Sequence, residues 1–316
     1  MRFNPKHKGS VSVQIIKIAK LAVALGMAMI LIAVATGKGL QKEIQDKTVA
    51  FNGHLVVAPF ENSESQISVL PIANDPTVLE MLKNEAGVQH VQGVALKGGL
   101  LKAGDQFEGV VMKGVSQDYQ WQVLKSFMVE GNYPQLRDQT SNEILLSKLI
   151  AQRLSVGVGD EVSAYFQNSQ NQQLPNVRKF KIVGLFLSGF PDFDENFVLG
   201  DLRHIQRINK WKNDEIGAYE VFTTDLKTSI NIASSIYQKL PSDLDVIEIT
   251  RQYASIFQWI SLFDFNILII IIVMIVVGVI NMSTALLVLI LERSSMIGLY
   301  KSLGANNRMI QKIFLY

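Results

Sequence analysis

The acidic residues closest together in this sequence are the best candidates for a chemically active cluster. Asp192, Asp194 and Glu195 lie within the segment GFPDFDENF. Carboxylates at this spacing could bind a hard cation, but such a site needs several more oxygen ligands that converge on one point. A solvated turn explains a Pro-Asp segment at least as well. The cluster therefore predicts no specific chemistry by itself, and its role stays open.

Residues that usually carry catalysis are either missing or scattered. The sequence has no cysteine, which excludes disulfides, thiolate zinc sites and cysteine nucleophiles. It has no P-loop motif, and the glycine-rich segment from Gly157 to Asp160 precedes a strand pattern and therefore predicts a turn. The four histidines show no metal-ligand spacing: His7, His54, His90 and His204. We expect a non-catalytic protein without a metal or cofactor of its own.

Charge divides the chain into basic ends and an acidic middle. Residues 1–20 carry five basic side chains and no acidic one, and residues 292–316 carry four basic side chains and one acidic one. Because the formal net charge of the whole chain is +2, the middle has a net negative charge. An acidic middle without basic patches and interleaved aromatic residues argues against nucleic acid as a partner.

The first apolar segment, residues 21–37, reads LAVALGMAMILIAVATG and contains no charged residue. It would form about 25 Å of helix, which is just long enough to cross a membrane. A cleaved signal peptide is the alternative, because Ala33-Val34-Ala35 resembles a small-residue cleavage site. Small residues at four-residue steps favour a helix that packs closely against another: Ala22, Gly26, Ala33 and Gly37.

The second apolar segment, Ile267 to Leu291, has no formal charge over 25 residues and predicts a transmembrane helix of about 37 Å. Its polar residues Asn281, Ser283 and Thr284 predict packing against another helix, with the lining of a substrate path as the alternative. Basic residues flank both spans on the terminal side, so the positive-inside rule places both ends of the chain in the cytoplasm. The residues between the spans then form one large extracytoplasmic domain.

This domain alternates strand and helix patterns, which predicts a folded α+β module. Strands are expected at His54 to Phe60, over VQHVQGVALKGGLL and GVVMKGV, and over VSAYF, KFKIVGLFL, YEVFTT and LDVIEI. Asp75 is expected to cap a helix that begins at Pro76 and runs to about Ala86, and a second helix is expected over Leu226 to Leu240. A third is expected around LLSKLIAQRL, with Leu145, Leu149 and Ile150 on one apolar face. The long intervening stretches suggest two subdomains.

After the second span, four residues at helical spacing form one apolar stripe: Met296, Leu299, Tyr300 and Leu303. Gly304 is suited to end this helix, and Asn306 or Asn307 to cap the next one. An amphipathic helix at this place either lies on the membrane surface or docks in a groove of a cytoplasmic partner.

The segment NMSTALLVLILERSSMIGLYKSLGANNRMIQKIF resembles the type VII ABC transporter permeases of the FtsX/MacB/LolC/LolE superfamily. The shared pattern is a Glu-Arg pair, an Ile-Gly pair and a Leu-Gly-Ala triplet. In the family this region is a coupling helix that docks on a separate ATPase. The resemblance therefore implies ATPase-coupling residues at Glu292, Arg293, Met296, Ile297, Gly298, Leu299, Tyr300, Leu303, Gly304 and Ala305.

The outer domain resembles the lipoprotein-releasing LolC/LolE branch over EILLSKLIAQRLSVGVGDEVSAYF and RKFKIVGLFLSGFPDFDENFVLGDL. The resemblance implies a MacB-like periplasmic core with Porter and Sabre subdomains. It also implies a hairpin that contacts a periplasmic carrier, although the tip here looks shorter and more polar than in LolC. The candidate carrier-contact residues are Gln167, Asn168, Gln172, Gln173, Leu174, Pro175 and Arg178.

The resemblance predicts the following segments: a basic N-terminus (1–20), transmembrane helix 1 (21–37), an extracytoplasmic domain (38–258), transmembrane helix 2 (259–291), a coupling helix (292–305) and the start of a third transmembrane helix (306–316). Because the family has four membrane helices, the chain looks truncated. The expected function is that of an inner-membrane permease subunit that uses a cytoplasmic ATPase to extract lipoproteins.

The expected partners are that ATPase, a second permease copy in a homodimer or heterodimer, a lipoprotein substrate, a periplasmic carrier and membrane lipid. A two-span sensory receptor is the alternative, because two spans around an outer domain also describe that class. A receptor should continue into heptads and signalling modules, whereas NNRMIQKIFLY turns back toward apolar character. A membrane-tethered enzyme is a third hypothesis, which would need the acidic cluster to lie in a cleft.

Overall fold

The computed structural model describes residues 11–62, 65, 67–167 and 175–315. The chain forms two compact units. The terminal unit consists of the two ends of the chain, up to Lys42 and from Gln258 onward. The outer unit consists of Glu43–Phe257.

The terminal unit is helical. Its elements are α1 (Val11–Asn52), which continues into the outer unit, α8 (Ala254–Glu292), α9 (Ser294–Ser302) and α10 (Asn307–Leu315). Two stretches are long and apolar enough to cross a membrane, Lys20–Asn52 and Ala254–Val288. Both helices are longer than the apolar segments predicted at 21–37 and 267–291. Polar residues on either side of each segment are helical as well.

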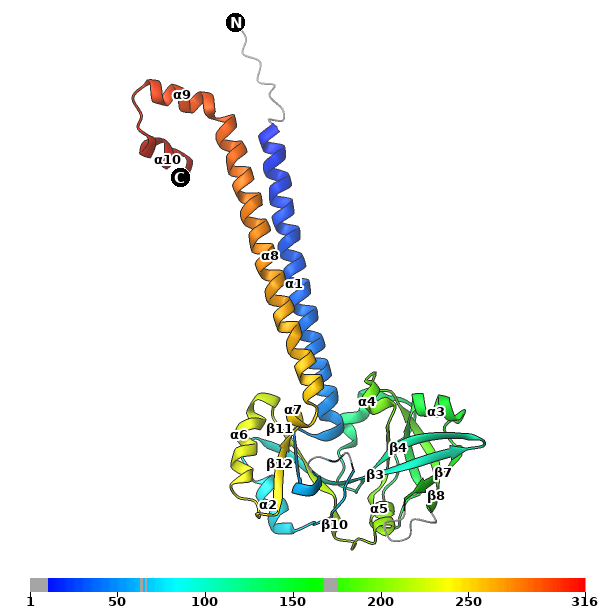
Figure 1. Cartoon of the computed structure of the whole chain (residues 1–316). Helices are drawn as coiled ribbons and strands as arrows, with labels where there is room; N and C mark the ends of the chain where they lie inside the picture. The colour runs from blue at the N-terminus through cyan, green and yellow to red at the C-terminus, as the bar shows by residue number, and fades with distance from the viewer. Residues whose placement is uncertain (1–10, 63–64, 66, 168–174, 316) are drawn as a thin grey trace. The chain divides into compact units, whose positions relative to one another are not determined.

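Within the terminal unit, α1 and α8 lie side by side (Figure 1). A Cβ added at Gly26 would lie 2.6 Å from Met274 Cε, and one added at Gly37 would lie 2.8 Å from Ile267 Cδ1. At both positions a larger residue would require the end of the neighbouring Met274 or Ile267 side chain to shift. At these two positions glycine therefore lies where α1 contacts side chains of α8, in agreement with the predicted close helix packing.

Two polar contacts add to the pairing of these helices. Lys38 Nζ lies 2.6 Å from Asp264 Oδ1, and the Gln41 side-chain amide donates to the main-chain carbonyl of Ile260 at 3.2 Å. The side chains of Lys38 and Asp264 are both exposed. An exposed ion pair adds little stability, so this one mainly orients α1 and α8 relative to each other.

The outer unit is built on one ten-stranded sheet in the order β12-β1-β11-β3-β4-β9-β6-β8-β5, with β7 paired to β3 and β8; β10 and β2 form a separate pair. The strands are β1 (Leu55–Pro59), β2 (Ile72–Ala73), β3 (Val88–Ala103), β4 (Gln106–Val115), β5 (Met128–Gly131), β6 (Glu143–Ser147), β7 (Glu161–Phe166), β8 (Asn176–Phe186), β9 (Phe197–Asp201), β10 (Glu215–Ile216), β11 (Ala218–Thr223) and β12 (Leu244–Glu248).

The helices of the outer unit pack on this sheet. They are α2 (Pro76–Lys83), α3 (Lys148–Leu154), α4 (Pro191–Asp194), α5 (Leu202–Asn209), α6 (Leu226–Tyr237) and α7 (Ile249–Gln252), with short 3-10 helices at Phe60–Asn62 and Trp121–Phe127. In Figure 1, α2 and α6 lie toward β11 and β12, whereas α3 lies toward β7 and β8. The predicted mixed fold of strands and helices is confirmed. The division into Porter and Sabre subdomains stays a prediction, because the sheet runs through one compact unit.

Local sequence signals account for most of these elements. Asp75 caps α2 as predicted, since its carboxylate accepts a hydrogen bond from Thr77 N at 2.8 Å. The helix ends at Lys83, three residues earlier than expected. The strands β7 and β8 pair in antiparallel register, which confirms the predicted hairpin.

One prediction about this region is wrong. Leu145 does not share a helix face with Leu149 and Ile150, because it lies in β6 between β8 and β9. The helix α3 begins at Lys148, where the Ser147 hydroxyl accepts from Leu149 N. A short apolar run that is buried on both faces of a sheet cannot be told from a buried helix turn by periodicity alone.

The second of two apolar clusters in the core forms around the end of α1. Phe51, in the last turn of α1, is 1% exposed, and its ring lies 4.6 Å from that of Phe193 and 5.4 Å from that of Phe186. The part of α1 that belongs to the outer unit is therefore anchored in its core by a large aromatic side chain.

Candidate functional site

The predicted coupling segment contains one short helix, α9. Glu292 is the last residue of α8, Arg293 precedes α9, and the predicted residues up to Ser302 follow in consecutive turns. The apolar side chains Leu299 and Leu303 are 60% and 76% exposed. Met296 and Tyr300 are half-buried. The predicted stripe therefore presents two large leucines to solvent within the described chain.

The end of α9 is fixed by its sequence. Gly304 has φ +90°, a conformation that side-chain-bearing residues rarely adopt, and Ala305 N donates to Tyr300 O at 3.0 Å. Asn306 caps α10, because its side-chain oxygen accepts from Met309 N at 2.9 Å. The predicted glycine stop is confirmed, and of the two predicted caps Asn306 makes the bond.

The hairpin predicted to contact a carrier is only partly described. Asn168, Gln172, Gln173 and Leu174 lie outside the described residues. Gln167 and Pro175 are exposed on either side of them. Arg178 is in β8, where its guanidinium donates to the main-chain carbonyl of Val177 at 2.9 Å. The role of these residues stays a prediction.

The acidic cluster does not converge on one point. Asp194 is 1% exposed, and its carboxylate accepts from the main-chain N–H groups of Ser188 and Gly189, each at 2.8 Å, and from the Ser188 hydroxyl at 2.9 Å. Glu195 faces Arg153 at 3.4 Å instead, and Asp192 is exposed. In the described part of the chain, no group of three or more His, Cys, Asp or Glu could hold a metal ion. Asp194 therefore acts as a local cap for the turn before α4.

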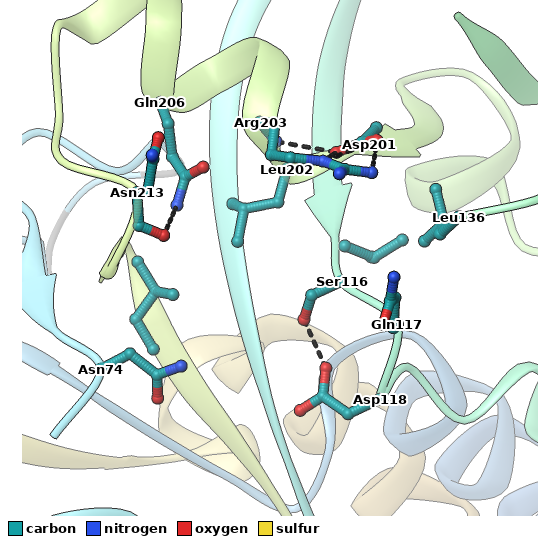
Figure 2. Close-up of a pocket in the computed structure, with 12 residues that line it drawn as sticks. Asn74, Ser116, Gln117, Asp118, Leu136, Asp201, Leu202, Arg203, Gln206 and Asn213 are labelled. Carbon is teal, nitrogen blue, oxygen red and sulfur yellow. Dashed lines mark hydrogen bonds and ion pairs between the residues drawn. The ribbon is translucent and has the colours of Figure 1, made fainter. Parts of the chain in front are cut away.

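A polar cleft of about 370 Å³ lies in the outer unit (Figure 2). Its lining comes from segments far apart in sequence, and no motif predicts it. The lining residues are Asn74, Val115, Ser116, Gln117, Asp118, Leu136, Asp201, Leu202, Arg203, Gln206, Asn213 and Ile216.

Arg203 is the only basic side chain in the described lining of this cleft, and each of its guanidinium nitrogens donates within the protein. Its guanidinium binds the Asp201 carboxylate at 2.6 Å and also donates to the main-chain carbonyls of Arg137, Asp138 and Gln139. Burial would raise the pKa of Asp201, but hydrogen bonds from Arg203 and from Ser141 N outweigh it and lower that pKa. Arg203 thus holds the 137–139 loop against the start of α5, and most of its guanidinium donors are already engaged there.

Two family models match the chain. Residues 18–252 match the MacB-like periplasmic core domain, and residues 268–316 match the FtsX-like permease C-terminal region. The second match covers α9 and α10, where a sensory receptor would instead continue into signalling modules, so it favours the permease hypothesis.

Similar proteins carry related descriptions. The chain is 22% identical to the lipoprotein-releasing system transmembrane protein LolC of Xylella fastidiosa, over 93% of this chain and 70% of that protein. It is 23% identical to the corresponding protein LolE of Haemophilus influenzae, over 98% of this chain and 74% of that protein.

Among solved structures, the chain matches the periplasmic region of MacB from Actinobacillus actinomycetemcomitans, with 16% identity and a TM-score of 0.43 over 66% of this chain and 92% of that one. The first family model alone spans most of the chain, and the second spans most of α8 together with α9 and α10. The chain therefore belongs to the FtsX/MacB superfamily of ABC transporter permeases.

Proposed function

We propose that this chain is the membrane subunit of an ABC complex in which a separate cytoplasmic ATPase drives the release of lipoproteins from the inner membrane to a periplasmic carrier. The names of the LolC and LolE relatives support the substrate class. The proposal also includes a second permease copy, because membership of the ABC transporter permease family implies a partner permease.

The observation that carries the proposal is the exposed pair Leu299 and Leu303. Leu299 lies in α9 and Leu303 caps the end of that helix, four residues later, within the segment matched to the FtsX-like permease region. Burying one leucine side chain is worth about 1.5–3 kcal/mol, so two exposed leucines on one face favour a partner that covers them. A groove on the ATPase that receives the apolar face of a short helix meets this need.

The proposed orientation of the chain in the membrane rests on the basic residues next to the two spans. Lys17 and Lys20 lie at the start of the first span, and Arg293, Lys301 and Arg308 follow the second. The positive-inside rule then places α9 in the cytoplasm and the outer unit in the periplasm. Under this orientation the ATPase and the lipoprotein carrier work on opposite sides of the membrane.

The mechanism that fits this arrangement is mechanical. Closure of the ATPase on nucleotide displaces α9, and α8 carries the displacement because it is one uninterrupted helix of 39 residues, about 58 Å long. The outer unit then changes its position and expels the lipoprotein on the periplasmic side. The lipoprotein does not pass through the membrane in this scheme.

Reconstitution tests the proposal. The chain and its co-purified ATPase are placed in vesicles that hold a fluorescent lipoprotein, and soluble carrier and ATP are added outside. We expect transfer of the lipoprotein to the soluble fraction only when ATP, carrier and chain are all present. If the chain retains no ATPase and changes no ATPase turnover, the proposal is wrong.

A further inference from the structure

The core of the outer unit contains a buried ion pair. Lys113 in β4 and Glu220 in β11 have side chains that are 1% and 4% exposed, and Lys113 Nζ lies 2.5 Å from Glu220 Oε1. Glu220 Oε2 also accepts from the Gln92 amide in β3 at 2.9 Å. Burial lowers the pKa of Lys113, and the charge of Glu220 opposes this shift.

Such a pair needs an explanation other than stability. Removing two charges from water costs several kcal/mol for each ion, and apolar residues of similar volume often stabilise a core as well or better. The ring of Tyr119 lies over the pair, with its centroid 5.6 Å from Lys113 Nζ, and excludes water from it. The pair is thus fully enclosed, and its geometry is fixed by hydrogen bonds.

The third partner of the pair is the first membrane helix. Lys113 Nζ donates to the main-chain carbonyl of Phe51, in the last turn of α1. Carbonyl groups in the last turn of a helix have no partner within the helix, and they carry the negative end of its dipole. The ammonium group therefore binds the end of α1 through its main chain, while the ring of Phe51 is held in the aromatic cluster.

The second membrane helix begins at the same place. Tyr253, the residue before α8, donates from its hydroxyl to the side-chain oxygen of Asn52 at 3.3 Å. Burial raises the pKa of Tyr253, and the nearby charge of Glu220 raises it further. The outer ends of α1 and α8 are thus joined to each other and to the ion pair within the outer unit.

We propose that Lys113 and Glu220 are positioning residues that lock the outer end of α1 to strands β4, β3 and β11, so that a displacement of the membrane helices moves the sheet as one body. The strands β11, β3 and β4 are consecutive neighbours in the sheet, and Glu220 and Gln92 face each other in register. Apolar packing is not directional, whereas hydrogen bonds between charged groups fix direction. The inference rests on the proposed function for the source of the displacement.

The decisive variant replaces both charges, Lys113→Met with Glu220→Leu. This change leaves no unpaired buried charge, so the outer unit should fold with nearly unchanged stability, but the bond to the Phe51 carbonyl is lost. Lys113→Met with Glu220→Gln is a second version that keeps a hydrogen-bonding group opposite Gln92, in case the first fails to fold. The matched control is Glu85→Gln with Lys239→Met, another Lys-Glu pair of the outer unit at 2.6 Å, which joins the segment after α2 to the segment after α6.

Two measurements on the full chain in its membrane complex test whether Lys113 and Glu220 lock the end of α1 to the sheet, a contact that we call the joint. The first is lipoprotein released per ATP hydrolysed, which should fall about tenfold in the double variant while ATPase binding and stimulation persist. The second is amide hydrogen exchange at Val49 to Asn52, which should accelerate about tenfold at unchanged global stability. The control pair should change neither quantity.

The outcomes separate this inference from the proposed function. If the double variant releases lipoprotein with wild-type yield per ATP and shows wild-type exchange at the end of α1, the joint does not exist and the inference is wrong. If the wild-type chain binds no ATPase, the proposed function fails. In that case the exchange measurement alone decides whether the ion pair locks the helix end.

Discussion

Lys113 Nζ lies 2.5 Å from Glu220 Oε1 inside the core of the outer unit, and the same ammonium group donates to the main-chain carbonyl of Phe51 at the end of α1. A buried charge pair of this kind connects three neighbouring strands to a helix that continues toward the membrane. It adds a non-covalent link to the main-chain connection that runs from the end of α1 into β1.

The stability of the pair can be measured separately from its role in positioning. Lys113→Met alone should destabilise the chain by about 3–5 kcal/mol, because it leaves the Glu220 carboxylate buried and unpaired. The double replacement Lys113→Met with Glu220→Leu should cost much less, so the two effects should be strongly non-additive. The free energies of unfolding of Lys113→Met, Glu220→Leu and the double variant, measured by heat or denaturant, give this non-additivity. Additive losses would show that the two groups do not interact.

The outer unit should lose stability in mild acid. Burial lowers the pKa of His204 and of His54 below the usual value near 6.5. Between the lowered pKa and 6.5 the unfolded chain therefore binds more protons than the folded one, so stability is present above about pH 6.5 and falls as the pH drops through that window. NMR titration of the two imidazole rings should give pKa values below 6.5. Values at or above 6.5 would contradict the buried environments found here.

Close packing of the membrane helices can be tested at neighbouring glycines. Gly37→Leu should separate α1 from α8, because a Cβ at Gly37 would lie 2.8 Å from Ile267 Cδ1. Gly39→Leu is the matched control, since nothing lies within 4 Å of a Cβ there. The chain has no cysteine, so Lys38→Cys with Asp264→Cys provides a clean cross-link across the pair. The cross-link should be weakened by Gly37→Leu and kept by Gly39→Leu; equal yields would argue against the packing.

The acidic cluster should behave as a structural cap and not as a cation site. Asp194→Asn removes charge-assisted acceptors for Ser188 and Gly189 and should cost about 1–3 kcal/mol of stability. Asp192→Asn, in the same cluster but exposed, should change stability little. Melting curves with added calcium or with a chelator should coincide for the wild-type chain. A calcium-dependent rise in melting temperature that Asp194→Asn abolishes would instead indicate a metal site.

Local signals in the sequence predicted many elements of the structure. Apolar length predicted both long helices, Asp75-Pro76 predicted the start of α2, and Gly304 predicted the end of α9, because each of these depends on neighbouring residues alone. Leu145 was assigned to a helix because buried strands and buried helix turns share the same apolar run. The joint between Lys113 and Glu220 could not be predicted, since its residues are 107 positions apart and meet only through the strand order.

Among the candidate sites, too, those formed by neighbouring residues could be predicted, whereas those assembled by the fold could not. The residues of α9 are contiguous, so a spacing argument and a family resemblance were enough to find them. The cleft around Asp118 and Arg203 is assembled from separate segments by the fold, and its lining has no motif. The contact of the β7–β8 hairpin with a carrier stays a prediction, because most of its tip lies outside the described residues.

The central claim is that the exposed stripe of α9 docks on an ATPase subunit. It is tested most directly by co-purification of the ATPase with Leu299→Asp and Leu303→Asp combined, with Leu100→Asp and Leu187→Asp on the outer unit as the matched control. We predict that the α9 variant loses the ATPase and its stimulated turnover while its outer unit remains folded, and that the control variant keeps both. Retention of the ATPase by the α9 variant at the wild-type level would contradict the claim and would favour a membrane-surface role for this helix.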